Sequence, residues 1–162
     1  MAALLPTLDN AIYARVVRGL ETRFRSDGLS LIVAQTGDAP DVELTCAKKM
    51  IDIGAEALVV VGVTHDPGLY ELIERTQRPV VAVSYYDESS EIPTIGYDNW
   101  KAASIAARHF ADLGHKHVGV VHGPAESNDR TQHRLSALSD QDFGITFTFV
   151  EVTHSMAGGF DG

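Results

Sequence analysis

The stretch from Ile95 to Pro124, IGYDNWKAASIAARHFADLGHKHVGVVHGP, constrains the fold more than any other part of the chain. Asp98 and Asn99 are residue types that cap a helix by accepting hydrogen bonds from its first N–H groups. Gly114 stands where a helix ends in the left-handed conformation. The β-branched run from Val118 to Val121 suits a buried strand of a parallel sheet. The stretch therefore predicts a short strand at Ile95, a capped helix, a glycine stop and a second strand.

Apolar residues recur at steps of three and four along this predicted helix, which is the spacing of one helical face. We expect this face to pack against the core, and it consists of Ala102, Ile105, Ala106, His109, Phe110 and Leu113.

The rest of the chain alternates between predicted strands and helices. The other strands are expected at Ala2–Leu5, Leu29–Ala34, Leu58–Val61, Pro79–Val83 and Phe147–Val152. The helices between them are expected to begin at the caps Asn10 and Asp41, at Pro67 in a first turn, and at Ser127. This alternation predicts an α/β fold with a doubly wound parallel sheet in three layers, α/β/α.

Composition excludes several classes of protein. The 162 residues, 44% of them hydrophobic, are enough for one cored domain or one domain plus a fragment. A net charge of −9 disfavours contact between this part of the protein and a nucleic-acid backbone. The sequence has neither a signal peptide nor a membrane span, so we expect a cytoplasmic location. The single cysteine, Cys46, falls on the apolar side of its helix and is expected to be an inert thiol.

No catalytic or cofactor motif is present. A phosphate loop, a dinucleotide-binding glycine motif and a nucleophile elbow are all missing from the sequence. His115 and His117 come closest to a metal pair, but they have no carboxylate or cysteine at ligand spacing. His122 follows a strand and is interpreted as a hydrogen-bonded loop residue. We therefore predict no enzyme activity, no metal and no cofactor.

Polar residues gather instead in the loops that follow the predicted strands. Ligands of doubly wound sheets bind outside the carboxyl ends of the strands, where these loops lie. Both donors and acceptors are available there for a polyhydroxylated ligand: Asp9, Asn10, Thr64, His65, Ser84, Asp98, Asn128, Asp129, Arg130 and Arg134.

Four segments resemble the lac-repressor-like family of bacterial transcription regulators, and more broadly the type I periplasmic-binding-protein fold. They are LLPTLDNAIYARVVRGLE, LVVVGVTHDPGLYELIE, the stretch described first, and NDRTQHRLSAL. The resemblance implies two similar α/β halves that close on a small ligand, often a sugar or nucleobase.

The resemblance also suggests which residues reach the ligand. Arg134 matches the arginine of the family's R-L-x-G segment, in which Ala137 here replaces the usual Gly, and an arginine can donate two parallel hydrogen bonds. Ser84 stands where the family often has Asp. Asp98 is explained by a capping role alone, or by capping together with a ligand contact. The implied ligand-binding set is Asp9, Asn10, Tyr13, Ser84, Asp98, Asn128, Arg130 and Arg134.

The same resemblance sets expectations for domains and partners. Residues 1–124 would form the N-terminal subdomain of an effector-binding domain, and residues 125–162 would begin a C-terminal subdomain that stops near Phe160. The family's helix-turn-helix and hinge would precede Ala2, so DNA would be bound only through that missing N-terminal domain. The expected partners are a small-molecule effector, a sugar or related polar metabolite, and a second copy in a homodimer.

Two other functions fit the same pattern of elements. A periplasmic solute receptor of a transporter has the same fold, and a signal peptide before Met1 would distinguish it from a regulator with a helix-turn-helix there. A hydrolase or isomerase would need a catalytic pair that the loops do not show, although fold alone does not fix function.

Overall fold

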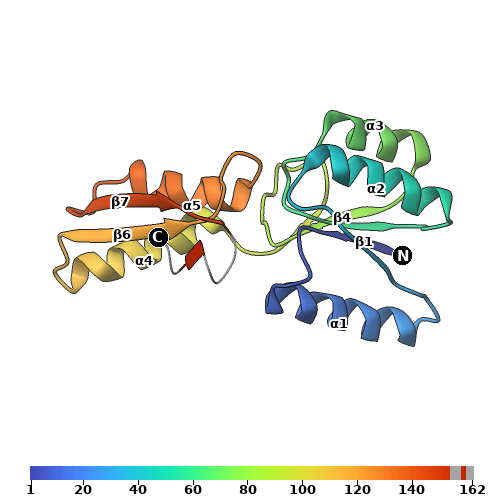
Figure 1. The fold of residues 1–162 in the computed structure, drawn as a ribbon, viewed down its shortest axis with the longest axis horizontal. Helices are drawn as coiled ribbons and strands as arrows, with labels where there is room; N and C mark the ends of the chain where they lie inside the picture. Colours follow the sequence, from blue (N-terminus) through green and yellow to red (C-terminus); the bar gives the residue numbers. More distant parts are fainter. Residues whose placement is uncertain (154–157, 160–162) are drawn as a thin grey trace. The chain divides into compact units, whose positions relative to one another are not determined.

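The computed structural model describes residues 1–153 and 158–159. The chain forms two compact units, Met1–Ile95 and Gly96–Gly162, here called unit 1 and unit 2 (Figure 1). The sequence pattern places the boundary at residue 124 instead. The difference arises because periodicity predicts a strand at Val118–Val121 without showing which sheet that strand joins.

Unit 1 is built on a five-stranded parallel sheet with the strand order β2-β1-β3-β4-β5. Its strands are β1 (Ala2–Leu5), β2 (Ile32–Gln35), β3 (Leu58–Val61), β4 (Val80–Val83) and β5 (Thr94–Ile95). Its helices are α1 (Ala11–Ser26), α2 (Pro40–Asp52) and α3 (Pro67–Thr76). Helix α1 covers one face of the sheet and α2 and α3 cover the other, which confirms the three-layer arrangement (Figure 1).

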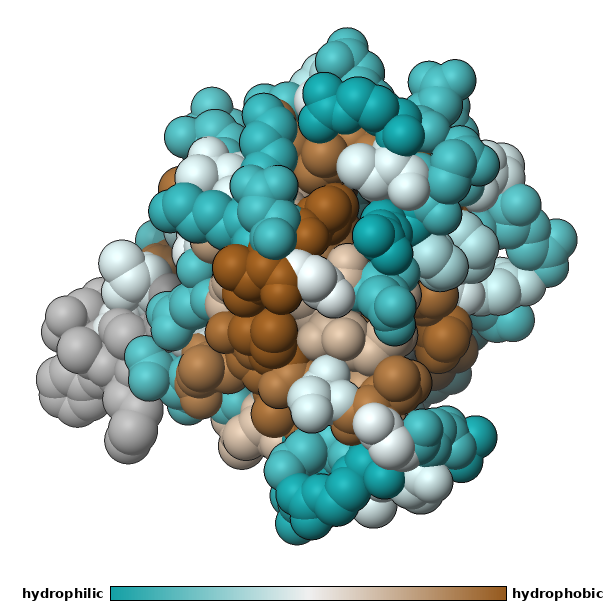
Figure 2. All heavy atoms as spheres, turned by 90° about the vertical axis from the view of Figure 1, so that its right-hand side faces the viewer, coloured by the Kyte–Doolittle hydropathy of each residue, from teal (hydrophilic) through white to brown (hydrophobic). Residues whose placement is uncertain are grey.

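The central strand β1 places its side chains in two separate cores. Leu4 packs with residues of α2 and α3, including Ala47 and Leu69, whereas Leu5 packs on the α1 side with Val17. Figure 2 shows one face of unit 1, on which hydrophobic side chains form a band between hydrophilic surfaces. All four residues of β1 are buried, as expected for a central parallel strand.

Most predicted helix boundaries of unit 1 are confirmed. Asn10 caps α1 by accepting from the Ile12 N–H, and Pro67 lies in the first turn of α3. Asp41 is not a cap, however: α2 begins at Pro40 with Ala39 as its N-cap. Proline is favoured at the first helical position because its missing N–H has no partner there, and the N-cap of α2 therefore lies two residues before Asp41, at Ala39.

Unit 2 contains α4 (Asn99–Asp112), β6 (His117–His122), α5 (Asp129–Ser139) and β7 (Thr146–Glu151). The two strands form their own parallel sheet, with His117 opposite Thr146 and His122 opposite Glu151. Two predictions for α4 are confirmed. Asp98 caps it by accepting from the Lys101 N–H, and Gly114 follows its end with a φ of 83°.

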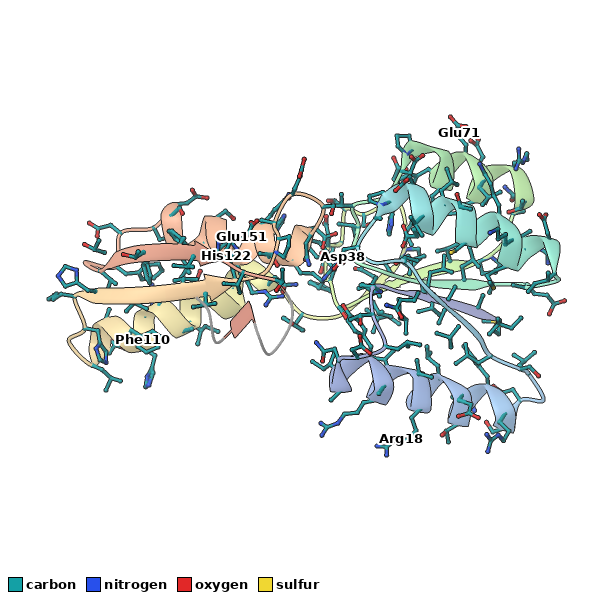
Figure 3. The ribbon with its side chains drawn as sticks, in the orientation of Figure 1. Arg18, Asp38, Glu71, Phe110, His122 and Glu151 are labelled. Atoms are coloured by element: carbon teal, nitrogen blue, oxygen red, sulfur yellow. The ribbon has the colours of Figure 1, made fainter. Side chains whose placement is uncertain are left out.

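The predicted inward face of α4 is wrong. Ile105 and Leu113 are 61% and 62% exposed, and Phe110 is also exposed, whereas Ala107 is buried and Ala103 is partly buried. Figure 3 shows Phe110 on this helix. Helices α4 and α5 pack against each other, and the small alanine side chains allow the axes to come close. The larger apolar residues therefore remain on the outside.

In the described part of the chain, no helix is both long enough and apolar enough to cross a membrane. The predicted stop near Phe160 lies outside the described residues.

Candidate ligand-binding site

In unit 1, Asp9, Asn10 and Tyr13 lie together where β1 leads into α1. Asn10 caps the helix with its side-chain oxygen. The Asp9 N–H donates a hydrogen bond to the Thr7 hydroxyl oxygen at 3.1 Å. Both residues are exposed, while Tyr13 is partly buried and packs against the α1-side core. One turn and one helix start therefore present a carboxylate and an aromatic ring at the carboxyl end of β1.

Ser84 follows β4 at the same edge of the sheet, because parallel strands share the direction of their carboxyl ends. Its backbone has a φ of 66°, in the left-handed region that non-glycine residues rarely adopt. Its N–H donates to the Ile95 carbonyl at 3.0 Å, which holds it beside β5. Asp38, in the loop after β2, also has a positive φ of 55° (Figure 3). Strained non-glycine residues of this kind cluster at functional sites.

The loop between β3 and α3 carries one member of a buried polar pair, and α2 carries the other. The His65 side chain is 0% exposed, and its Nδ1 lies 2.6 Å from Oε2 of Glu43, whose side chain is 9% exposed. Sequence reasoning placed His65 among the polar loop residues but missed Glu43. A contact between residues on two separate elements leaves no local signal in the sequence.

In unit 2, Asn128 and Arg130 lie at the start of α5. Asn128 caps the helix by accepting from the Thr131 N–H at 3.1 Å. Arg130 donates from Nη1 to Asp129 at 2.8 Å, and both of these side chains are almost completely buried. The pairing of Arg130 with Asp129 was not foreseen. The Arg130 guanidinium is therefore already hydrogen-bonded to a carboxylate of its own helix.

Arg134 lies one turn further along α5 and reaches α4. Its Nε donates to the Asn99 Oδ1 and to the Arg130 carbonyl, each at 3.1 Å. Asn99 is buried, while Arg134 is exposed as a residue. The bond to Asn99 fixes the direction of the guanidinium. The structure therefore brings Asp98, Asn128, Arg130 and Arg134 together around the starts of α4 and α5.

The histidines of unit 2 that the structure describes do not form a set of metal ligands. His115 and His117 are exposed, and His122 bonds to the Gly123 carbonyl at 2.8 Å from the last position of β6. Among the residues that the structure describes, no three His, Cys, Asp or Glu side chains form a group that could hold a metal ion.

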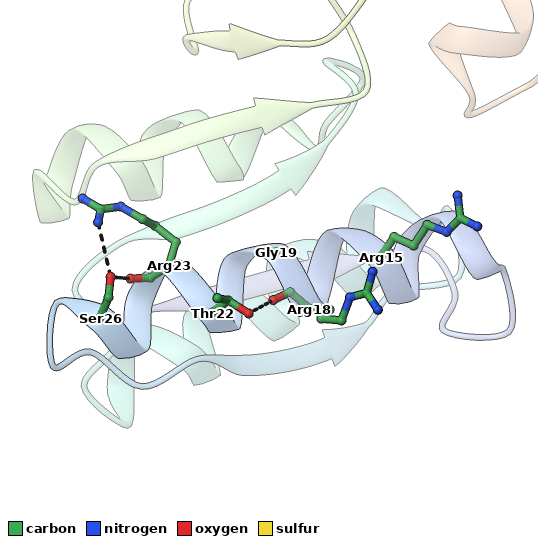
Figure 4. Close-up of a pocket in the computed structure, with 6 residues that line it drawn as sticks. All are labelled: Arg15, Arg18, Gly19, Thr22, Arg23 and Ser26. Atoms are coloured by element: carbon green, nitrogen blue, oxygen red, sulfur yellow. Dashed lines mark hydrogen bonds between the residues drawn. The ribbon is translucent and has the colours of Figure 1, made fainter.

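A shallow hollow follows the outer side of α1, away from these loops (Figure 4). It is lined by Arg15, Arg18, Gly19, Thr22, Arg23 and Ser26. Thr22 and Ser26 donate their hydroxyls to carbonyls of their own helix. The hollow is a shallow groove between exposed arginine side chains. The candidate ligand site is therefore still the set of loops at the carboxyl ends of the strands.

A doubly wound parallel sheet with polar, partly strained loops at its carboxyl edge, joined to a second α/β unit, defines the class of small-molecule-binding domains. The family described as "Periplasmic binding proteins and sugar binding domain of LacI family" matches residues 1–156, and the chain belongs to it.

Known relatives are transcription regulators. The chain is 28% identical to the HTH-type transcriptional regulator GntR of Escherichia coli K12 over 121 residues, which are 75% of this chain and 37% of GntR. The Cra regulator of Pseudomonas putida, solved with fructose 1-phosphate, superposes with a TM-score of 0.78 at 22% identity, covering 93% of this chain and 56% of that one.

A third similar protein is a periplasmic binding protein/LacI transcriptional regulator from Alkaliphilus metalliredigens, solved with D-xylulofuranose. Its TM-score is 0.72 at 20% identity, covering 96% of this chain and 57% of that one. Compared with GntR, the first relative named above, the chain covers little more than a third of the full length.

Proposed function

We propose that this chain is the effector-binding part of a bacterial transcription regulator, and that its ligand is a sugar or a related polar metabolite. Two observations carry the proposal, one in each unit: polar side chains lie at the loops after β1 and β4 of unit 1, and others lie at the starts of α4 and α5 of unit 2. These groups donate and accept hydrogen bonds, and the sequence contains no phosphate loop and no nucleophile elbow. Binding without catalysis is the chemistry that they support.

The ligand class is supported by two similar proteins. The Pseudomonas putida Cra structure holds fructose 1-phosphate, and the Alkaliphilus metalliredigens structure holds D-xylulofuranose. We propose that the contacts come from Asp9, Asn10, Tyr13 and Ser84 in unit 1, and from Asp98, Asn128, Arg130 and Arg134 in unit 2. Arg134 is the central donor because Asn99 holds its guanidinium in place.

The output that we propose is control of DNA binding in the cytoplasm by a homodimer whose DNA-binding head belongs to the longer parent protein. The regulators among its relatives support this function over that of a transporter receptor. Unit 1 would then be the N-terminal subdomain, and unit 2 would begin the second one. Ligand binding would shift the balance between conformations of the parent that differ in DNA affinity.

The proposal is tested by titrating the purified chain with D-xylulose and with fructose 1-phosphate in a calorimeter. We expect at least one of them to bind, and Arg134→Ala to weaken that binding by about tenfold or more, because a hydrogen-bonded charged donor contributes on the order of 1.5–3 kcal/mol.

Arg108→Ala is the matched control, because Arg108 is an exposed arginine on the neighbouring helix α4. It should leave affinity unchanged, and both variants should keep the circular dichroism spectrum of the parent. Unaltered affinity in the Arg134 variant would remove Arg134 from the site. If neither sugar binds, the proposed ligand class fails.

A further inference from the structure

The Glu43–His65 pair is a deeply buried polar contact between separate elements of unit 1. Glu43 lies in the first turn of α2, and His65 lies in the loop between β3 and α3. Both side chains are at least nine-tenths buried, and the 2.6 Å separation of Nδ1 and Oε2 is that of a short, strong hydrogen bond.

The other ring nitrogen of His65 identifies the donor. Among the described residues, Nε2 of His65 is the one buried side-chain nitrogen or oxygen that has no hydrogen-bond partner. A buried N–H without an acceptor is costly, so the ring proton belongs on Nδ1, beside the carboxylate. From there it is donated to the Glu43 carboxylate, and Nε2 keeps only a lone pair.

The loop that carries His65 is held at its start by the Gly62 N–H, which donates to the Val83 carbonyl of β4 at 3.0 Å, and further along by its own helix. Asp66 caps α3 by accepting from the Gly68 N–H at 2.8 Å, and the Tyr70 hydroxyl donates to the Val63 carbonyl at 3.1 Å. The Tyr70 ring also meets the imidazole edge-on, with centroids 6.0 Å apart. These contacts join the loop to α3. The Glu43–His65 bond joins it to α2.

We propose that Glu43 and His65 are a positioning pair for the ligand site. The pair holds the β3–α3 loop against α2 at the carboxyl edge of the sheet, and it thereby sets where the exposed Thr64 stands relative to the loops after β1 and β4. This inference rests on the proposed function for its effect on ligand affinity. The tethering of the loop can be measured without a ligand.

The first experiment is amide hydrogen exchange on the ligand-free chain. His65→Leu and Glu43→Leu each break the pair, and we expect the amides of Val63 and Thr64 to exchange about tenfold faster or more. The double variant should exchange no faster than either single variant, because the two side chains act through one contact. His65→Asn should restore slow exchange, since its amide nitrogen occupies the position of Nδ1. Unchanged loop exchange in both single variants, or fully additive effects, would overturn the proposal.

The ring proton gives a second test that does not depend on any variant folding well. Nitrogen-15 spectra of the unmodified chain should show His65 protonated on Nδ1 and unprotonated on Nε2. The opposite tautomer would overturn the assigned bond.

Calorimetry with D-xylulose and fructose 1-phosphate then connects the pair to function. Affinity should fall in His65→Leu and recover in His65→Asn, and affinity that is equal in all variants would refute the positioning role. If the unmodified chain binds neither sugar, the proposed function fails, while the exchange experiment still decides whether the pair tethers the loop.

Discussion

At the scale of single residues, Tyr86 shows how one contact changes a chemical property. Its hydroxyl donates to the Glu88 carboxylate in the loop after β4. This hydrogen bond, together with the negative charge of Glu88, raises the pKa of the Tyr86 phenol above its usual value. The resulting stabilisation is present below the usual tyrosine pKa and is lost as the pH rises through the raised pKa.

We therefore predict that Glu88→Ala lowers the pKa of Tyr86 towards that of a free tyrosine. Ultraviolet absorbance of the phenolate measures this, and Tyr86→Phe identifies which part of the signal belongs to Tyr86. If Glu88→Ala does not change the titration curve of Tyr86, the hydrogen bond between Tyr86 and Glu88 does not form in solution.

Single residues also show how far the sequence could be interpreted. The caps Asn10 and Asp98 were predictable because a cap acts within three residues of itself. The Glu43–His65 bond was not, because its partners are 22 residues apart and neither flanking sequence suggests the other. The ligand role of Arg130 stays a prediction, and its bond to the adjacent Asp129 could not be foreseen from residue types.

At the scale of elements, the cap of α4 can be tested separately from any ligand role of Asp98. Asp98→Ala removes the acceptor of the Lys101 N–H and should destabilise unit 2 by about 0.5–2 kcal/mol, whereas Asp98→Asn should cost less. Urea unfolding followed by the fluorescence of Trp100 measures the change. Asp112→Ala, at the other end of α4, is the control and should not destabilise, since a carboxylate there opposes the helix dipole.

The central strand provides a second prediction at this scale. Leu5 is 0% exposed and fills the core on the α1 side, so Leu5→Ala should destabilise unit 1 by about 2–5 kcal/mol. Circular dichroism during urea unfolding reports the loss. Leu8→Ala, at an exposed leucine in the following turn, should change stability by less than about 0.5 kcal/mol. Equal losses in the two variants would contradict the core assignment.

Elements also explain why some predictions succeeded and one failed. β1 and β3 were predicted at their observed bounds because a short aliphatic run in an α/β pattern has few alternatives. The face of α4 was predicted wrongly because hydrophobicity alone favours Ile105 and Leu113 as core residues. The close approach of α5 instead selected the side that carries Ala107.

At the scale of the whole molecule, the two units have very different cores. In the described structure, unit 2 has Ala107 and Ala137 as its buried hydrophobic residues, whereas unit 1 buries Leu4, Leu5, Leu58, Leu69 and several others. The doubly wound class was predictable from the alternation of elements. The division into units was not, because it depends on β6 pairing with β7.

We predict that the units unfold in separate transitions. The chain has a single tryptophan, Trp100, and it lies in unit 2, so its fluorescence follows that unit alone. The fluorescence midpoint in urea should be lower than the midpoint of circular dichroism, which both units contribute to, because unit 2 buries less apolar surface. Leu5→Ala should lower the dichroism midpoint and leave the fluorescence midpoint in place. Coincident midpoints that move together would show one cooperative molecule.

The parallel pairing of β6 with β7 also has a consequence during synthesis. Parallel strands cannot close as a hairpin, and α5 must be made between them. Unit 1 has its last strand, β5, before β6 leaves the ribosome, whereas β7, the strand that pairs with β6 in the described structure, emerges only after α5. At about 5–20 residues per second, that interval is roughly 1–6 seconds. During this time the Val118–Val121 segment of the nascent chain is open to chaperones and to other nascent chains.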